Sequence, residues 1–202
     1  MSKNQQPEDQ ALTWEEVSLE HLVQDEWIDF RRSAYRFPDG RVFQPYYSFT
    51  RRDYAVIVAT DEEGNYICVR QFRHGIRQVT TEFPAGGIEK KDSTTGSGGC
   101  EADAVQEALS AARRELREET GYESDEWEHL ISIPANATIS DNYAHVFRAR
   151  NCRLTSPQHL DEMELLRVQK YTAAEIEAMV SSGGFQQAVH VMAWLLAKER
   201  ET

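Results

Sequence analysis

The chain has 202 residues, with 22 lysines and arginines against 34 aspartates and glutamates, so its formal net charge is −12. This length suits one compact domain with a small appendage, and it suffices to bury an apolar core without disulfides or metals. The excess of acid argues against a nucleic-acid partner and against an anionic membrane surface, because both attract clustered cations. No apolar run approaches the ~20 residues of a membrane span, and the polar start of the chain is unlike a secretory signal.

The cysteines and two histidines predict no metal or disulfide chemistry. Cys68, Cys100 and Cys152 are too few and too widely spaced for a disulfide framework or a CxxC zinc site. We therefore expect a reducing, cytoplasmic location and thiols that pack as small buried side chains. His145 and His190 lie in apolar segments without a second ligand at metal spacing, so we expect structural roles for both.

The first 50 residues predict a tail and a small β appendage. Residues 1–12 are polar and rich in Gln, Asn and acids, which is typical of disorder. The Pro-Asp-Gly sequence at 38–40 predicts a turn between two extended stretches. We therefore expect residues 13–50 to form the appendage and residues 51–202 to form the main domain.

The main domain has the pattern of strands on both sides of a long helix. Apolar, β-branched runs between turn signals predict a hairpin and further strands at 54–60, 66–72, 78–83, 131–134, 144–150 and 165–171. Apolar residues at i, i+3 and i+4 predict a helix over 101–120 that a glycine ends. Thr172 and Glu175 form a capping box for the next helix, and a final helix is expected over 185–200. The absence of regular βα alternation indicates an α+β fold, an α/β/α sandwich with a mixed sheet, and not a Rossmann fold.

Three glutamates near the end of the long helix predict a metal site. On a helical wheel Glu115, Glu118 and Glu119 border or enter the apolar face. Carboxylates at this spacing repel one another, oppose the helix dipole and are costly to bury without a cation. Hard cations such as Mg²⁺ prefer oxygen ligands, and Arg114 can pair with Glu118 and orient the group. The competing interpretation is a solvated acidic helix end, which the neighbouring arginines would tolerate.

Residues 114–122 read RELREETGY and resemble the second half of the Nudix box, REUxEExGU, in which U is an apolar residue. The box opens with Gly, five residues, Glu, and then seven residues before the Arg. Gly86 matches that Gly. Counting back from Arg114 leads to Gln106, so the opening Glu finds no match, and the polar loop 90–101 exceeds the length of the pattern.

Other segments resemble the ADP-ribose and ADP-sugar pyrophosphatase branch of this family: VRQFR at 69–73, TEFPAG at 81–86, the acidic stretch 162–168 and the C-terminal helices. The resemblance implies a Nudix-type fold and Mg²⁺-dependent, or Mn²⁺-dependent, hydrolysis of ADP-ribose or a related ADP-sugar to two monophosphates. It also implies a homodimer in which the β appendage is exchanged. Two alternatives stay open: another substrate, such as GDP-mannose or a dinucleotide, and a non-catalytic module that binds a nucleotide metabolite. Three intact glutamates argue against the second.

The resemblance also assigns metal-binding and catalytic residues. The expected metal ligands are the carboxylates Glu115, Glu118 and Glu119 and the backbone carbonyl of Ala85. Glu162 is expected as the base that activates water and Glu164 as a carboxylate linked to the metal, although an exposed acidic loop is the plain alternative. Arg114 is expected to orient the helix carboxylates.

Substrate contacts are expected from the arginines that offset the negative total charge. Arg70 and Arg73 stand on a stretch without acids, and the resemblance adds Arg52 and Glu82 as residues that contact an ADP-ribose-like ligand. Arginine suits a phosphate because its fork of N–H groups can bind two oxygens at once. Ordinary surface arginines are the alternative. Aromatic residues near the N-terminus either stack on a base or pack in the core or an interface: Trp14, Trp27, Tyr46 and Tyr47.

Overall fold

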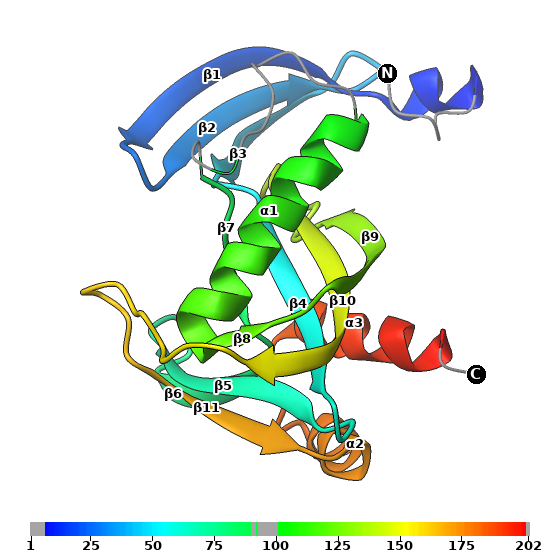
Figure 1. The fold of residues 1–202 in the computed structure, drawn as a ribbon. Coiled ribbons are helices and arrows are strands. Elements are labelled where there is room, and N and C mark those ends of the chain that lie inside the picture. Colours follow the sequence, from blue (N-terminus) through cyan, green and yellow to red (C-terminus); the bar gives the residue numbers. More distant parts are fainter. Residues whose placement is uncertain (1–6, 90–91, 93–100, 201–202) are drawn as a thin grey trace. The chain divides into compact units, whose positions relative to one another are not determined.

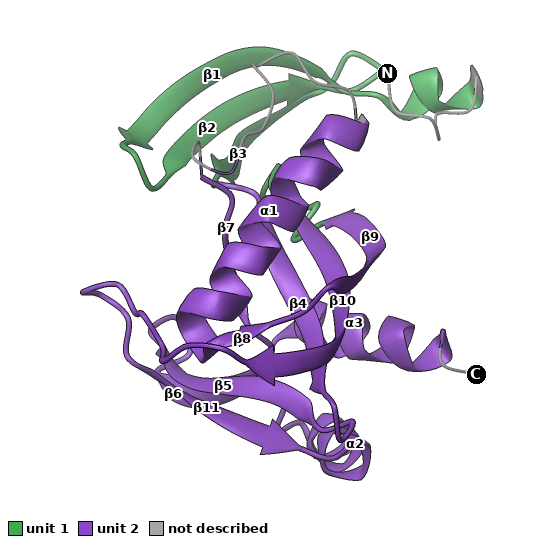
Figure 2. Cartoon of the chain, in the orientation of Figure 1, with its two compact units in different colours: residues 1–51, 134–142 green, residues 52–133, 143–202 purple. Residues whose placement is uncertain are grey.

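The computed structural model describes residues 7–89, 92 and 101–200. It divides the chain into two compact units, coloured separately in Figure 2. Unit 1 contains residues 1–51 and 134–142, and unit 2 contains residues 52–133 and 143–202. The polar loop expected over 90–101 lies outside the described residues except at its positions 92 and 101. No helix among the described residues is long and apolar enough to cross a membrane.

Unit 1 is built on a three-stranded antiparallel sheet (Figure 1). Its strands lie in the order β1 (Glu15–Gln24), β2 (Asp29–Arg36) and β3 (Val42–Thr50). The expected turn at 38–40 joins β2 to β3, and Gly40 adopts a φ of 88° there. β1 was not predicted, because its side chains are almost all exposed and it pairs with β2 largely through charged partners such as Glu20 and Arg32.

The structure departs from the disordered tail expected over residues 1–12. Pro7–Leu12 form the short 3₁₀-helix η1, and residues 1–6 lie outside the described part. The polar composition still permits this turn, because Thr13 Oγ1 donates a hydrogen bond to the Asp9 carbonyl at 2.9 Å. Local side-chain bonds of this kind can satisfy a short turn without any apolar core.

Unit 2 contains a mixed sheet with the strand order β11 (Leu166–Tyr171), β5 (Tyr66–Arg73), β4 (Tyr54–Asp61), β10 (Tyr143–Leu154) and β8 (Tyr122–Glu123). Three further strands join its edges: β6 (Gln78–Glu82) on β5, β7 (Ala85–Gly87) on β4 and β9 (Glu126–Pro134) on β10. β4 and β10 run parallel, whereas β5 runs antiparallel to β4, β6 and β11, β7 runs antiparallel to β4, and β8 runs antiparallel to β10. The expected hairpin is therefore the β4–β5 pair.

Helices cover both faces of this sheet, which confirms the expected α/β/α sandwich with a mixed sheet (Figure 1). α1 (Glu101–Thr120) packs on one face through Ala108, Ala112 and Leu116, as its periodicity predicts. α2 (Ala173–Ser182) and α3 (Ala188–Glu199) pack on the other face. The predicted capping box opens α2. Because α1 follows β7 in sequence and also lies against it, the glycine-rich strand and the acidic helix meet in one place.

Candidate active site

The site begins with carboxylates that α1 turns toward the sheet. Glu115 is 7% exposed and Glu119 is 3% exposed, so both lie on the inward face that the helical wheel predicts. Gly86 on β7 makes room for them, because a Cβ built at this glycine would lie 2.1 Å from the Cδ of Glu115. Strand β7 and helix α1 can therefore approach closely only with glycine at this position.

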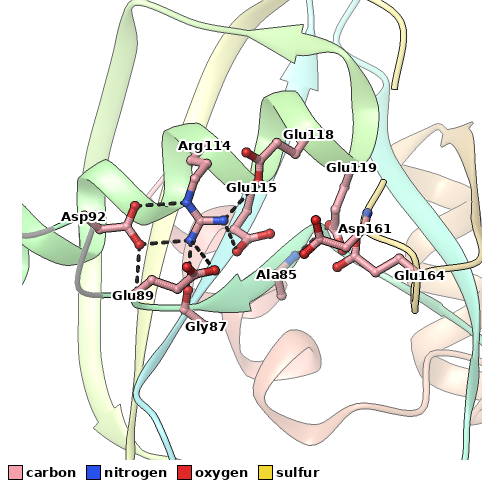
Figure 3. A network of polar contacts seen from close by, with 10 residues as sticks. All are labelled: Ala85, Gly87, Glu89, Asp92, Arg114, Glu115, Glu118, Glu119, Asp161 and Glu164. Carbon is pink, nitrogen blue, oxygen red and sulfur yellow. Dashed lines mark hydrogen bonds and ion pairs between the residues drawn. The ribbon is translucent and has the colours of Figure 1, made fainter. Parts of the chain in front are cut away.

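Arg114 lies at the centre of the network in Figure 3. Its side chain is 12% exposed, and its Nη1 donates to Glu115 Oε1 at 2.7 Å and to Glu118 Oε2 at 3.0 Å. Nη2 donates to the carbonyl of Gly87 at 3.0 Å. One guanidinium thus fixes two of the three helix carboxylates and ties them to β7. Burial opposes its charge, but the carboxylates around it raise the pKa of Arg114, so it stays protonated.

Asp92 is a further partner of Arg114. The sequence analysis did not predict this contact. Its two carboxylate oxygens accept from Nε and Nη2 of Arg114, both at 2.9 Å, which is the strong bidentate geometry. The opening Glu of the box still has no Glu as counterpart, but an Asp contacts Arg114 here. When five residues are left after Gly86, as in the box, the next position counted forward is 92. The shorter Asp stands there, and the extra length of the chain falls between 92 and 114.

Burial and mutual repulsion perturb the helix carboxylates. Burial raises the pKa of Glu115 to about 7; Arg114 opposes this shift, and the charges of Glu118 and Glu164 add to it. Burial also raises the pKa of Glu119 well above its usual range, with a further contribution from Glu115. Glu119 Oε2 accepts from the N–H of Ala85 at 3.0 Å. Crowded, half-compensated carboxylates with raised pKa values are typical of functional sites.

The acidic turn 161–164 lies beside this cluster (Figure 3). Glu164 Oε2 accepts from the Asp161 N–H at 3.1 Å, and Figure 3 shows both residues beside Glu119, on the side away from Arg114. Glu162 and Glu164 are both exposed on this turn. The charge of Glu164 contributes to the raised pKa values of Glu115 and Glu119, whereas the role of Glu162 stays a prediction.

The half-exposed Arg73 forms an ion pair with the buried Glu82. Arg73 Nε lies 2.9 Å and 3.0 Å from the two oxygens of Glu82, which is fully buried. Burial raises the pKa of Glu82, but hydrogen bonds from Arg73 and Thr80 outweigh it and lower that pKa, so the carboxylate is charged. The charge of Glu119 also contributes to the raised pKa of Arg73. Arg73 and the helix carboxylate of Glu119 are therefore coupled electrostatically.

Arg70 and Arg52 differ from Arg73 in their setting. Side chains alternate along a strand, so Arg70 faces the opposite side of β5 from Arg73. Arg52 is exposed in the short link before β4. Their substrate roles stay predictions.

The N-terminal aromatic residues that were candidates for base stacking are partly engaged in packing. The ring of Trp14 lies 4.1 Å from that of Phe37, and Tyr47 stacks on Phe30 at 5.7 Å. Tyr46 donates to the carbonyl of Thr138. These contacts within unit 1 support packing for the three residues.

Both histidines expected to be structural are buried and bonded. His190 Nδ1 accepts from the Phe83 N–H at 3.1 Å, and His145 Nδ1 lies 2.8 Å from Ser132 Oγ. These partners account for both rings without a metal.

The donor set of the cluster fits a hard divalent cation. Glu115, Glu118 and Glu119 of α1 and Glu164 of the acidic turn all end in carboxylate oxygens, and the first and third of these are nearly buried. As the side chains stand, no three acidic, histidine or cysteine side chains in the described part of the chain come close enough together to hold an ion. Arg114 and the Ala85 N–H hold three of the carboxylates. The chemistry of the residues therefore fits Mg²⁺, whereas the coordination geometry stays a prediction.

A comparison with family models identifies the chain. The model described as "NUDIX domain" matches residues 50–195, well over half of the sequence. The chain belongs to the Nudix family. The match includes β7, α1 and the acidic turn, so the carboxylate cluster lies wholly inside the Nudix domain and the first two strands lie outside it.

Similar proteins carry consistent descriptions. An "ADP-ribose pyrophosphatase" of Bacillus subtilis (strain 168) is 27% identical over 173 residues, covering 85% of each chain. An "ADP-ribose pyrophosphatase" of Mycobacterium tuberculosis (strain ATCC 25618 / H37Rv) is 26% identical over 184 residues, covering 88% of this chain and 80% of the relative. A solved structure titled "Crystal structure of ADP compounds hydrolase" superposes with a TM-score of 0.75 at 20% identity, covering 93% of each chain, and shows that the Nudix fold is shared. This protein is thus a hydrolase of the Nudix family.

Proposed function

We propose that the protein is a Mg²⁺-dependent pyrophosphatase that splits ADP-ribose, or a related ADP-sugar, into two monophosphates. The observation that supports this most strongly is the Arg114-centred carboxylate cluster on α1, together with the Arg73–Glu82 pair. The cluster offers oxygen ligands for cations, and the pair offers a guanidinium for a phosphate. The names of two relatives, both ADP-ribose pyrophosphatases, support the choice of substrate.

We propose that four carboxylates and one backbone carbonyl hold the metal ions. Glu115, Glu118, Glu119 and Glu164 would hold the cations, together with the expected carbonyl of Ala85. When bound, Mg²⁺ supplies charge neutralisation of the diphosphate and acidification of water. Mn²⁺ suits the same oxygen ligands.

The chain's own groups supply orientation and proton transfer. Arg114 fixes the carboxylate oxygens of Glu115 and Glu118 through Nη1. Arg73 is held by Glu82 through Nε and Nη2, and we propose that its Nη1 donates to a phosphate of the substrate. Glu162, exposed on the acidic turn, serves as the base that accepts the proton of the attacking water.

A substrate panel tests the proposal. The purified protein is incubated with Mg²⁺ and ADP-ribose, another ADP-sugar, GDP-mannose and a dinucleotide, and the released monophosphates are measured. We expect the fastest hydrolysis with ADP-ribose or the ADP-sugar. Faster hydrolysis of GDP-mannose or the dinucleotide would show that the protein is a pyrophosphatase with a different substrate from the one proposed. Tight binding of a nucleotide without any hydrolysis would instead favour the non-catalytic module.

Gly86→Ala tests whether the approach of β7 to α1 matters for the reaction. The added Cβ would overlap the Glu115 carboxylate, so we expect hydrolysis to fall at least ~10-fold. Gly75→Ala is the matched control, because a Cβ there meets nothing within 4 Å. Equal activity of the two variants would contradict the placement of Glu115 in the site.

We also propose a homodimer formed through unit 1 and a cytoplasmic location. β1 leaves apolar side chains exposed, including Leu19, Leu22 and Val23, which a second copy could cover. Light scattering coupled to gel filtration tests this, and a mass of one chain would contradict it. Cys68 and Cys152 are free, buried thiols, which suits a reducing compartment.

A further inference from the structure

The C-terminal end of α1 is capped by the segment 155–159, which follows β10. The N–H of His159 donates to the carbonyl of Glu118 at 2.9 Å, and Gln158 Nε2 donates to the carbonyl of Glu119 at 2.6 Å. The N–H of Thr155 donates to the carbonyl of Gly121 at 2.9 Å. A helix leaves its last carbonyls without partners inside the helix, so this segment supplies the missing donors. Two of the capped residues are the proposed metal ligands Glu118 and Glu119.

The capping segment and the helix end are in direct contact. Gly121 has a φ of 77°, and a Cβ built on it would lie 2.0 Å from the carbonyl oxygen of Ser156. The glycine that ends the Nudix box therefore serves two purposes here. It adopts the left-handed conformation that ends α1, and it admits the backbone of the capping segment.

Hydrogen bonds, rather than apolar packing, hold this segment in place. A hollow of about 590 Å³ lies along it, lined by Leu154, Thr155, Ser156, Pro157 and Gln158 together with side chains of α1, β8 and β11. Leu154 is 65% exposed, so the segment is not anchored in the core at its start. A segment with few buried apolar contacts depends on its individual hydrogen bonds for its position.

The acidic turn continues directly from this anchored point. Asp161 follows His159 by two residues, and Glu164 completes the turn through a backbone bond from its N–H to the Asp161 carbonyl at 2.9 Å. Figure 3 shows the turn next to Glu119, whose own carbonyl holds Gln158. The bond from Gln158 to the Glu119 carbonyl therefore ties the segment that leads into the acidic turn to the end of the helix that carries the carboxylates.

We propose that Gln158 is a positioning residue that fixes the acidic turn against the helix carboxylates. This inference rests on the proposed hydrolase function, because it concerns how Glu162 and Glu164 are placed for the reaction. The Gln158 amide is suited to this role: it forms the shortest of the capping bonds, and it comes from a side chain, so a substitution can remove it. Gln158 is itself exposed, so losing the bond leaves the core packing intact.

Three variants test the role of this amide. Gln158→Leu keeps the approximate shape and removes the donor, whereas Gln158→Lys restores a donor that suits a helix C-terminus. Gln186→Leu is the matched control, because Gln186 is also exposed and its Nε2 donates across to Gln78 Oε1 at 2.8 Å. Each variant is assayed for kcat and KM on the best substrate of the panel, and hydrogen exchange is followed over residues 159–164.

We expect Gln158→Leu to lower kcat at least ~10-fold while KM stays within about threefold, because misplacement affects the reacting geometry more than binding. Amide exchange over 159–164 should rise about tenfold, with the urea unfolding midpoint unchanged. Gln158→Lys should recover most of kcat, and Gln186→Leu should match the wild type.

Three results would overturn the inference: wild-type kcat in Gln158→Leu, a loss of kcat without faster exchange, or no recovery in Gln158→Lys. A wild-type protein that hydrolyses nothing would instead refute the proposed function. In that case unchanged amide exchange over residues 159–164 in Gln158→Leu would also refute the claim that Gln158 anchors the turn. Faster exchange would support that claim, although the turn would then have no role in hydrolysis.

Discussion

His190 should make the protein less stable in acid by an amount that can be measured. The ring is buried in α3, and a backbone N–H can only donate, so the bond from Phe83 requires a lone pair on Nδ1. Burial lowers the pKa of His190 to about 4, with a contribution from the positive charge of Arg73 and an opposing one from Glu82. Protonation would place an N–H against an N–H in a dry environment.

The sign and size of the effect follow from linkage. The unfolded chain binds a proton at His190 near pH 6.5, whereas the folded chain does so only near pH 4, so stability falls as the pH drops through this window. Each pH unit corresponds to about 1.4 kcal/mol, so the full loss is about 3 kcal/mol below pH 4 and about 2.5 kcal/mol at pH 4.5.

Urea unfolding of the wild type and of His190→Asn at pH 7 and pH 4.5 isolates this contribution. Asn places an acceptor oxygen where Nδ1 stands but does not titrate, so its smaller volume adds only an offset that is the same at both pH values. We expect the stability difference between the two proteins to change by about 2.5 kcal/mol between the two conditions. His74→Asn, at an exposed site, controls for the loss of a histidine. Parallel pH profiles for the wild type and His190→Asn would refute the reasoning.

Two further substitutions test the framework of the site. Asp92→Ala leaves the buried Arg114 without its bidentate partner, so we expect a loss of about 3 kcal/mol in urea unfolding and a fall in kcat that Asp92→Glu largely avoids. Gly121→Ala should cost about 2 kcal/mol more than Gly64→Ala, because both glycines have a φ near 80° but only Gly121 faces a backbone oxygen, that of Ser156. Equal losses of unfolding free energy in the two glycine variants would show that the capping segment can move away from an added Cβ without destabilising the protein.

The elements of unit 2 could be predicted because their local signals agree with their packing. The helix over 101–120 has the bounds that its periodicity and Gly121 indicate, and the Thr172 capping box opens α2 as expected. The helical wheel likewise placed Glu115 and Glu119 on the inward face. In each case the residues that decide the outcome lie within a few positions of one another in the sequence.

The features that escaped prediction depend on contacts between distant segments. The side chains of β1 are of mixed type and almost all exposed, so the sequence shows no alternating apolar pattern there. Its register with β2 places charged partners opposite each other, and these contacts are known only from the folded structure. Asp92 is separated from Arg114 by a long insertion, so a fixed spacing counted from the arginine misses it. Arg70 and Arg73 lie on opposite faces of β5 because side chains alternate along a strand. The sequence analysis grouped them by their charge alone and did not separate the two faces.

The central claim is that the α1 carboxylates hold Mg²⁺ for hydrolysis of a nucleoside diphosphate sugar. The most direct measurement compares Mg²⁺ binding by calorimetry and ADP-ribose hydrolysis in the wild type, Glu118→Gln and the exposed control Glu62→Gln. The Glu118 side chain is 27% exposed, so its variant should fold normally. We predict that Glu118→Gln loses at least ~100-fold in hydrolysis and binds Mg²⁺ much more weakly, while Glu62→Gln behaves as the wild type. Near-normal hydrolysis and Mg²⁺ affinity in Glu118→Gln would contradict the assignment of the metal site.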